Sequence, residues 1–161
     1  MARIAILTAS DKGALGERQD VSGDTIARRI AEAGHQLAHR AILPDDRNAL
    51  AATLATWADE FTVDIILTTG GTGLTPRDIT PEATRDIAER DVPAIPIALA
   101  LSGLQNTPFA ALSRGIAVTR GRTLIVNLPG SPRAVAEGLD VLLPLFPHIA
   151  ELLAGPLEHT P

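Results

Sequence analysis

At 161 residues the chain is long enough to bury a full hydrophobic core, and its length fits a single domain. Its 19 acidic and 14 basic residues give a net charge of -5, which argues against nucleic acid or an anionic membrane as a partner. Cysteine does not occur in the sequence, which excludes disulfides, thiolate metal sites and thiol nucleophiles. We find neither a signal-peptide pattern nor an apolar run of membrane-spanning length, and we expect a soluble cytoplasmic protein.

Apolar runs alternate with helical patterns through the first ninety residues. Residues 3–9 and 63–69 are apolar without alternation, which is typical of strands that are covered on both faces. Residues 36–42 are less apolar and predict a strand nearer an edge of the sheet. Helices are predicted over residues 24–33, 47–60 and 81–90. The polar segment 10–23 is long for a plain connection, which indicates a functional loop.

Local signals fix the expected helix ends. Ser22 is a candidate N-cap for the first helix, and Gly34 ends that helix at its C′ position. Thr80, followed by proline, is the expected N-cap of the third helix. The second helix carries one apolar stripe, formed by Leu50, Leu54, Trp57 and Phe61.

The second half of the chain has further such signals. A short apolar helix is predicted over residues 97–104, after Pro93 and Pro96. A helical turn near Phe109 and a strand over residues 115–120 follow, and Arg120-Gly121-Arg122 predicts a hairpin into a buried strand over 123–127. Ser131-Pro132 begins a helix that runs to Leu143. A last helix covers residues 145–153, and residues 156–161 are expected to form a loose tail.

This order of elements predicts an α/β fold. Alternating strands and helices imply βαβ units, and hence three layers with a mainly parallel sheet between helices on both faces. We expect one domain over residues 1–161, with its core within residues 3–155.

Residues 67–84 (LTTGGTGLTPRDITPEAT) are the most informative stretch. A buried strand turns through Gly70, Gly71 and Gly73, which are free to take positive φ, and a loop with Arg77 and Asp78 then leads to a helix N-terminus. Free amides and the helix dipole together suit an anion. The stretch matches neither the P-loop nor the dinucleotide-binding glycine pattern. The alternative is that the glycines only build a tight connection, but such a connection would not need the two charges.

Four predicted loops leave the carboxyl ends of strands, where open parallel sheets bind ligands. They carry Ser10 and Asp11, Asp45 and Asp46, residues 70–80, and residues 127–131. Amides suit phosphate, and Mg²⁺ binds one or two carboxylates while water and phosphate oxygens complete its shell. The sequence therefore indicates a site for a nucleotide–Mg²⁺ complex.

Several of these residues also have purely structural interpretations. Either Asp45 or Asp46 could cap the next helix, which leaves the other free. Asp11 could be an ordinary turn aspartate, and Asp78 could pair with Arg77. Ser131 fits an N-cap better than a nucleophile. The four histidines show no metal-ligand spacing. Solvated surface is the default interpretation of the remaining cations, although Arg133 follows a helix start and could reach a phosphate: Arg114, Arg120, Arg122 and Arg133.

These motifs resemble a known family. TTGGTGLTPRDITPEAT, with LPD before it and NLPGSP after it, is similar to the MoaB/Mog family of molybdenum-cofactor biosynthesis, and so are ILTASDKGALGERQDVSG and ALSRG. The resemblance covers nearly the whole chain and implies a molybdopterin-binding-domain-like fold. It also implies transfer of an adenylyl group from Mg·ATP to molybdopterin, with release of pyrophosphate.

The resemblance assigns roles to individual residues. Asp45 and Asp78 match the two aspartates that are essential in the family, and we assign them to holding Mg²⁺ and positioning the triphosphate. The other expected binding residues are Ser10, Asp11, Gly70, Gly71, Thr72, Gly73, Thr80, Asn127, Pro129, Gly130 and Ser131. The resemblance further implies a homo-oligomer, a trimer or a hexamer.

One segment departs from the family. Relatives have a glycine, and then a glutamate and an arginine three residues apart, where this chain has Ala94, Ile97 and Ala100. We expect this apolar helix to be buried in the core or in a subunit interface. The departure also leaves an alternative function, a catalytically weak scaffold that binds pterin or nucleotide in the same pathway.

Overall fold

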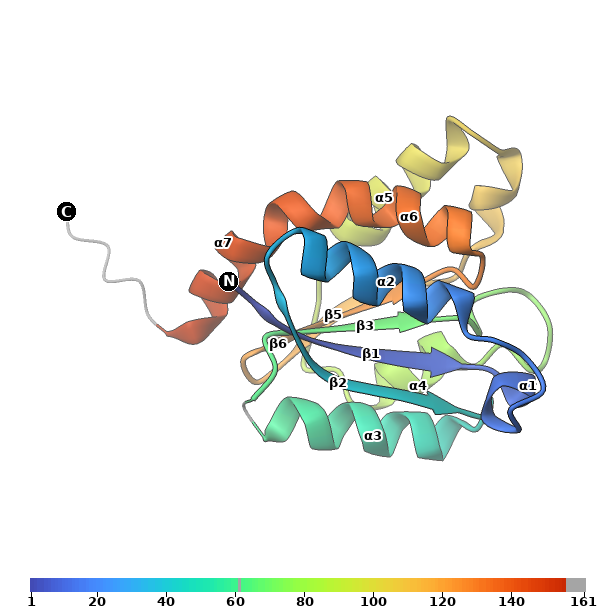
Figure 1. Cartoon of the computed structure of the whole chain (residues 1–161), viewed down its shortest axis with the longest axis horizontal. Coiled ribbons are helices and arrows are strands. Elements are labelled where there is room, and N and C mark those ends of the chain that lie inside the picture. Colours follow the sequence, from blue (N-terminus) through green and yellow to red (C-terminus); the bar gives the residue numbers. More distant parts are fainter. Residues whose placement is uncertain (61, 156–161) are drawn as a thin grey trace.

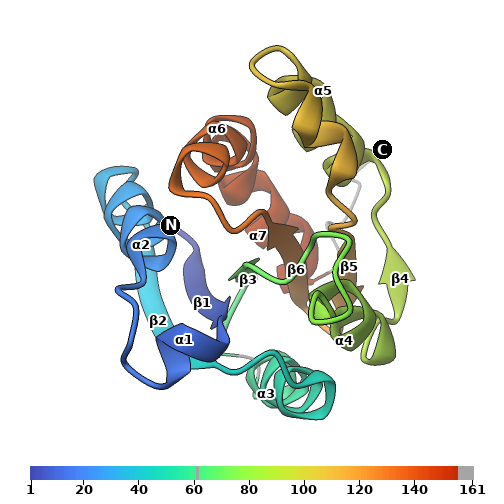
Figure 2. The same ribbon diagram turned by 90° about the vertical axis from the view of Figure 1, so that its right-hand side faces the viewer.

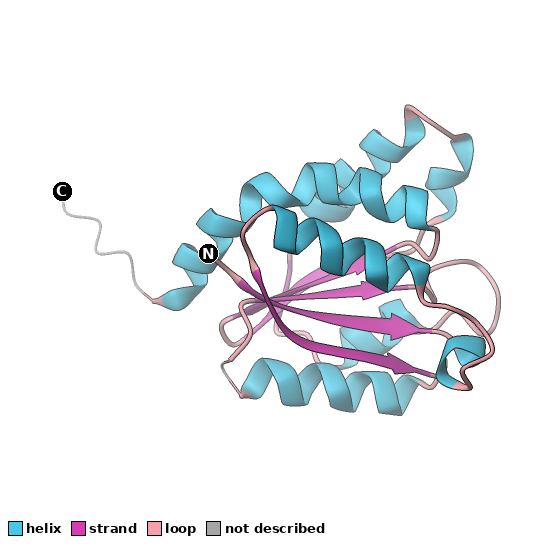
Figure 3. Ribbon diagram, in the orientation of Figure 1, coloured by secondary structure: helices cyan, strands magenta, loops and turns pink. Residues whose placement is uncertain are grey.

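The computed structural model describes residues 1–60 and 62–155, and its centre is a six-stranded sheet. The strand order is β2-β1-β3-β6-β5-β4. The strands form the middle layer of the ribbon diagram, with helices above and below them (Figure 3). The first four strands of this order run parallel to one another, whereas β5 pairs antiparallel with β6, and β4 pairs antiparallel with β5 at the edge. The strands are β1 (Arg3–Ala9), β2 (Gln36–Leu43), β3 (Ile65–Thr69), β4 (Arg90–Asp91), β5 (Ala117–Arg120) and β6 (Thr123–Leu128).

Helices cover both faces of the sheet (Figures 1 and 2). One face packs against α2 (Val21–Glu32), α5 (Ala94–Leu104), α6 (Pro132–Leu142) and α7 (Phe146–Ala154). The other face packs against α3 (Arg47–Asp59) and α4 (Thr80–Asp86). Three short helical segments complete the described chain: α1 (Asp11–Ala14), η1 (Pro108–Leu112) and η2 (Leu143–Leu145).

The apolar strands supply both cores at once. Along β1, Ile4 and Ile6 face the core under α2 and α6, whereas Ala5 and Leu7 face the core over α3. All four side chains are fully buried. A strand with helices on both faces needs no polar positions, which explains the unbroken apolar runs of the sequence. The predicted three-layer architecture and the edge position of β2 are confirmed.

The helix predicted over residues 24–33 is α2, and it begins earlier than predicted, at Val21. Its N-cap is Asp20 and not Ser22, because the Asp20 carboxylate accepts a hydrogen bond from the Gly23 amide. The Ser22 hydroxyl instead donates to the Gly130 carbonyl oxygen. Gly34 ends the helix with a φ of 78°, as predicted. The segment predicted as a loop also contains the single turn α1.

The third predicted helix is shorter than expected. Its N-cap is Ile79, without a side-chain hydrogen bond, so the prediction that Thr80 caps it is wrong. The helix ends at Asp86, well before the predicted Arg90. Arg90 belongs to β4, because pairing with Thr119 on β5 replaces the last helical turn.

The remaining elements follow the predictions closely, except that α5 begins at Ala94 and not at Ile97, so that Pro96 lies within its first turn. The helical turn η1, the β5–β6 hairpin and the Ser131 cap of α6 are all present. The predicted stripe residue Phe61 and the tail 156–161 lie outside the described residues. In the part of the chain that is described, no helix combines the length and the apolar character needed to cross a membrane.

Candidate active site

The loops that leave the carboxyl ends of β1, β2, β3 and β6 meet at one edge of the sheet, the edge that faces the viewer in Figure 2. Two cavities open there. The polar cavity, about 690 Å³, lies between residues 8–22, Asp45 and the start of the glycine loop. The apolar cavity, about 440 Å³, lies between the glycine loop, α5, η1 and α6. Both are lined by the same four residues, which we call the shared wall: Gly71, Asp78, Gly130 and Ser131.

The glycine loop, residues 70–79, needs its glycines for two different reasons. Gly70 and Gly71 have φ values of 87° and 68°, and a Cβ on either would lie within 2.5 Å of a neighbouring oxygen. Gly73 does not take positive φ, so that part of the prediction is wrong. A Cβ on Gly73 would lie 2.9 Å from Asp78 Oδ2, and its absence lets the carboxylate fold back against the loop.

Asp78 is held by its own loop. Its Oδ2 accepts hydrogen bonds from the Thr75 amide at 2.9 Å and the Thr75 hydroxyl at 2.8 Å. Burial acts to raise the pKa of Asp78, but the Thr75 and Gly73 hydrogen bonds and the charge of Arg114 outweigh it, so the pKa lies below its usual value. Asp78 is therefore an oriented and ionised carboxylate.

Asp45 and its neighbour have separate tasks. Asp46 caps α3 by accepting from the Ala49 amide at 2.8 Å, which leaves the Asp45 carboxylate free for the cavity. Burial raises the pKa of Asp45, and the negative charges of Asp11 and Asp78 raise it further. Asp11 and Asp78 are thus near enough to Asp45 to repel its charge, which Arg77 offsets only in part, and a bound cation would relieve this repulsion.

Asp11 connects two of the loops. Its Oδ1 accepts from the Asp45 amide at 2.9 Å, and both of its oxygens accept from Arg77 Nη2, at 2.7 and 2.8 Å. The Asp45 amide and then Arg77 lower the pKa of Asp11. Arg77 thus bridges from the glycine loop to Asp11, instead of pairing with Asp78. Ser10, beside it, caps α1 and lines the polar cavity.

Thr80 has a buried hydroxyl with no protein partner. Its Oγ1 makes no hydrogen bond to any described residue, although Thr80 is only 1% exposed. This oxygen and Asp45 Oδ1 lie 2.3 and 3.2 Å from the position that a Gly71 Cβ would occupy. An unpaired buried hydroxyl costs about 1–3 kcal/mol, and this one lies directly behind Gly71 of the shared wall, although Thr80 itself lines neither cavity.

The loop after β6 forms the opposite side. The Asn127 amide group is committed to the protein, since Nδ2 donates to the Thr68 and Thr84 hydroxyls and Oδ1 accepts from the Ile116 amide. The Pro129 carbonyl accepts from the Thr69 hydroxyl at 2.7 Å. Asn127 and Pro129 both line the apolar cavity, as does Thr72, whose carbonyl accepts from the Arg114 amide.

The site carries few candidate metal ligands. Within the described ranges, no cluster of three or more histidine, aspartate or glutamate side chains could hold a metal ion. A Mg²⁺ site needs only one or two protein carboxylates when phosphate and water complete the shell. Asp45 and Asp78 fit that requirement.

Comparison with known proteins identifies the family. The family model described as "Probable molybdopterin binding domain" matches residues 5–148. A molybdopterin adenylyltransferase of Helicobacter pylori is 36% identical over 154 residues, which cover 94% of this chain and 88% of that protein. The chain belongs to this family.

Two further family relatives differ in size. The Drosophila melanogaster molybdenum cofactor synthesis protein cinnamon is 40% identical over 92% of this chain, but the match spans only 25% of cinnamon. The crystal structure of the molybdopterin biosynthesis enzyme MoaB from Thermus thermophilus is 49% identical, with a TM-score of 0.89 over 97% of this chain and 98% of that one. The expected MoaB/Mog fold is thereby confirmed.

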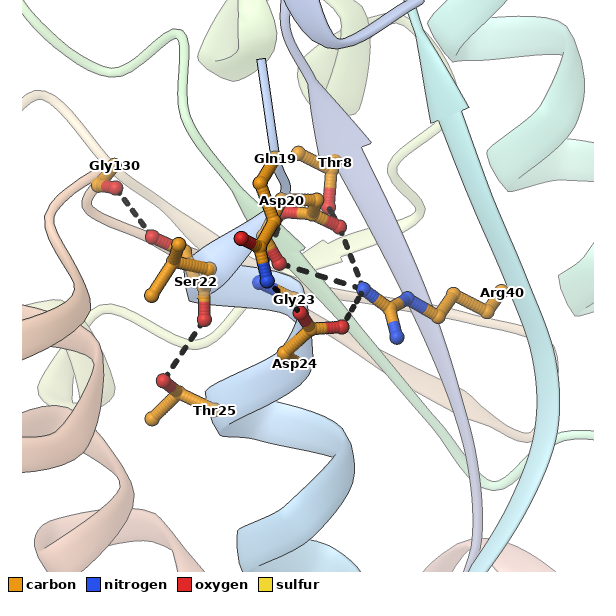
Figure 4. Close-up of polar contacts among 10 residues, drawn as sticks. Thr8, Gln19, Asp20, Ser22, Gly23, Asp24, Thr25, Arg40 and Gly130 are labelled. Carbon is orange, nitrogen blue, oxygen red and sulfur yellow. Dashed lines mark hydrogen bonds and ion pairs between the residues drawn. The ribbon is translucent and has the colours of Figure 1, made fainter. Parts of the chain in front are cut away.

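Within this member of the family, sequence reasoning missed a polar cluster around Asp20 (Figure 4). The Asp20 carboxylate accepts from the Thr8 hydroxyl at 2.8 Å and from Arg40 at 3.0 Å, and its side chain is only 5% exposed. Arg40 also bonds Asp24 at 2.7 Å. The cluster fixes one wall of the polar cavity. The spacing of Asp20 and Gly23 is typical of an N-cap and could have revealed the cap, but not the contact with Arg40.

Three expectations about arginines need correction. Arg120 is not a solvated surface cation, because its guanidinium bonds the Asp59 carboxylate and the Ile87 carbonyl. Arg114 is not a solvated surface cation, because its guanidinium bonds the Gly73 and Asp78 carbonyls and Glu82. Arg133 does not point to a phosphate site, since its Nε donates to Glu137 one helical turn further along α6.

The three positions that depart from the family lie on α5. Ala100 lines the apolar cavity, so this wall is apolar at the position where the resemblance led us to expect an arginine. Ile97 is 59% exposed in the single chain, Ala94 is also exposed, and α5 has no fully buried residue, so the alternative that this helix is buried in the core is wrong.

Proposed function

We propose that this protein is a molybdopterin adenylyltransferase of molybdenum-cofactor biosynthesis, acting in the cytoplasm. The observation that carries the proposal is the shared wall, where Asp78 stands between a polar and an apolar cavity with the crowded Asp45 beside it. An enzyme that joins two substrates needs two pockets that meet at the reacting atoms. An adenylyltransferase joins two substrates in this way, and one relative of the chain is named molybdopterin adenylyltransferase.

The two cavities suit the two substrates. Lys12, Arg18 and the Gly70 and Gly71 backbone line the polar cavity, which suits the phosphates of ATP. Leu99, Phe109 and Leu112 line the apolar cavity, which suits the flat pterin ring system of molybdopterin. The reacting phosphates of both would then meet at Gly71 and Asp78.

The proposed reaction is an in-line displacement. A terminal phosphate oxygen of molybdopterin attacks the α-phosphorus of ATP, the bond from that phosphorus to the bridging oxygen breaks, and pyrophosphate leaves with the bond electrons. Asp45 and Asp78 would hold Mg²⁺, which supplies neutralisation of phosphate charge when bound. Thr80 would donate a hydrogen bond to a phosphate oxygen, and the glycine-loop amides would orient the triphosphate.

Incubation of the purified protein with molybdopterin and Mg·ATP tests this proposal. We expect adenylylated molybdopterin and pyrophosphate in equal amounts, both formed far more slowly with Asp78→Asn. The scaffold alternative is favoured by Ala100, which leaves the apolar cavity without the family's arginine. Tight binding of both ligands by calorimetry, with no pyrophosphate formed, would support the scaffold and overturn the enzyme.

We further propose that copies of this chain assemble through α5 and η1 into a trimer or a hexamer. Large apolar side chains are exposed together there, which is costly in an isolated monomer: Ile97, Leu101, Leu104, Phe109 and Leu112. Ile97→Glu should lower stability and weaken assembly, and adding Ala100→Arg one turn away should recover part of the loss. A wild-type monomer in light scattering at micromolar concentration would rule the assembly out.

A further inference from the structure

Arg114 lies beside the active site without facing into either cavity. Its neighbours Ser113 and Gly115 line the apolar cavity, whereas Arg114 lines neither cavity. Its side chain turns the other way, toward the glycine loop and the first turn of α4. Because the side chain is turned toward the protein, we expect any effect of Arg114 on the reaction to pass through the residues that it holds.

Arg114 joins the two ends of the glycine loop into a hydrogen-bonded ring, because its guanidinium bonds a carbonyl at each end. Nε donates to the Gly73 carbonyl at 2.8 Å, and Nη2 donates to the Asp78 carbonyl at 2.7 Å. The Arg114 backbone amide donates to the Thr72 carbonyl at 2.9 Å. Both arms of the loop are therefore fixed to one side chain.

Glu82 fixes the guanidinium in turn. Nη1 donates to Glu82 Oε1 and Nη2 reaches Oε2 at 3.4 Å, so the planar fork is held by a carboxylate while it holds two carbonyls. The pKa of Glu82 is lowered, chiefly by its hydrogen bond from Arg114. Glu82 lies in the first turn of α4, and α4 is held in place because its Ala83 packs in the same core as Ile66 of β3.

Apart from the bonds between Arg77 and Asp11, the loop segment between the two carbonyls makes few contacts that order it. Residues 74–77 are all exposed, so no buried apolar side chain anchors them. This segment contains Thr75, whose amide and hydroxyl orient the Asp78 carboxylate. Loss of the ring would leave two unpaired carbonyls and would let Thr75 and Asp78 move together.

We infer that Arg114 is a positioning residue for adenylyl transfer: it clamps the glycine loop and so holds the Asp78 carboxylate in its place in the shared wall. The inference rests on the proposed function. Because the Thr107–Gly115 segment also lines the apolar cavity, the clamp connects the pterin side of the site to Asp78.

Arg120 supplies a matched control. It is the last residue of β5, whereas Arg114 lies three residues before that strand begins, and it makes the same kinds of bond, two to the Asp59 carboxylate and one to the Ile87 carbonyl. It lines neither cavity. Arg114→Gln and Arg120→Gln therefore remove similar contacts, one before β5 and one at its end, and both should lower Tm by a similar few degrees.

Steady-state kinetics of adenylyl transfer tests the clamp. We expect Arg114→Gln to lower kcat about 100-fold, the size of effect that misplacement of a reacting group produces, with KM for ATP changed less than about threefold. Arg114→Lys, which can hold one carbonyl but not the fork, should recover part of the loss. Arg120→Gln should keep the wild-type kcat. In Asp78→Asn, the added Arg114→Gln should cost nothing more, since both act through one group.

Three outcomes would overturn the clamp. A wild-type kcat in Arg114→Gln would show that the loop holds itself. A raised KM with unchanged kcat would make Arg114 a substrate contact. Losses that multiply in the double variant would show that Arg114 acts independently of Asp78. Absence of transfer by the wild-type protein is a different result and would remove the proposed function instead.

Discussion

Carboxylates at the two ends of the central strands have pKa values that are shifted in opposite directions. At the amino end, Asp64 accepts from the Arg3 amide at 2.7 Å and from Arg3 Nη2 at 2.8 Å. Burial acts to raise the pKa of Asp64, but these bonds outweigh it and the pKa is lowered. At the carboxyl end, burial and neighbouring acids leave the pKa of Asp45 raised.

The difference separates stability from function within one sheet. A paired buried carboxylate stabilises the native state, whereas a crowded carboxylate and an orphan hydroxyl are costs that only a bound ligand can offset. Such costs cluster at functional sites. We therefore expect changes at the carboxyl end to affect activity more than stability, and changes at the amino end to do the reverse.

Asp78→Asn should give the largest effect. Adenylyl transfer should fall by roughly 100- to 1,000-fold, the usual loss when a preorganised charge is removed from a reaction centre. Tm should change little, because Asn can still accept from Thr75. Pyrophosphate release and thermal melting measure the two quantities. An unfolded variant would make Asp78 a structural residue, and a fully active one would remove it from the mechanism.

Asp45→Asn should lower activity less and change the role of the cation. With one carboxylate of the crowded group gone, nucleotide affinity should depend less on Mg²⁺, which calorimetry with and without Mg²⁺ measures. Asp46→Asn is the matched control, because asparagine caps a helix about as well as aspartate. Wild-type activity in Asp45→Asn would show that this carboxylate does not take part.

Thr80→Val isolates the orphan hydroxyl. The change keeps the shape of the side chain and removes a buried oxygen that has no protein partner among the described residues. Activity should fall about tenfold, in line with the loss of one hydrogen bond to a charged group. Tm should stay level or rise. A lower Tm with unchanged activity would show that the hydroxyl serves the fold.

The sequence predicted the sheet better than the site, for a physical reason. Buried strands are recognised from apolar runs such as residues 3–9. The Ser131 and Gly34 caps depend only on neighbours in the chain. Contacts such as Arg114 with Asp78 or Arg40 with Asp20 join residues 20 to 36 positions apart, and no local spacing encodes them.

The same distinction explains the error at Thr80. Thr-Pro-Glu has the local pattern of a helix start, and the helix does start there. The tertiary structure, however, places the Thr80 hydroxyl beside Gly71 instead of over the helix amides. The neighbouring pair Asp45 and Asp46 shows the opposite case, since the sequence predicted that one would cap and the other would stay free.

Asp64→Asn should have the smallest effect on activity and a clear effect on stability. It removes a carboxylate whose side chain is 19% exposed and which bonds both the amide and the guanidinium of Arg3. We expect the free energy of unfolding at pH 7 to fall by about 1.5–3 kcal/mol, typical of hydrogen bonds to a charged group, while kcat is unchanged.

The pH dependence of this loss identifies its origin. Because the pKa of Asp64 is lower in the folded protein, its contribution is fully present above the unfolded value, about 3.9, and is lost as pH falls through the folded value. The difference in unfolding free energy between wild type and Asp64→Asn should therefore be constant at neutral pH and should shrink below about pH 4. Urea unfolding from pH 7 to pH 3 measures it. A difference that persists in acid would mean that Asp64 stabilises through packing, and a loss of kcat would mean that the two ends of the sheet are not independent.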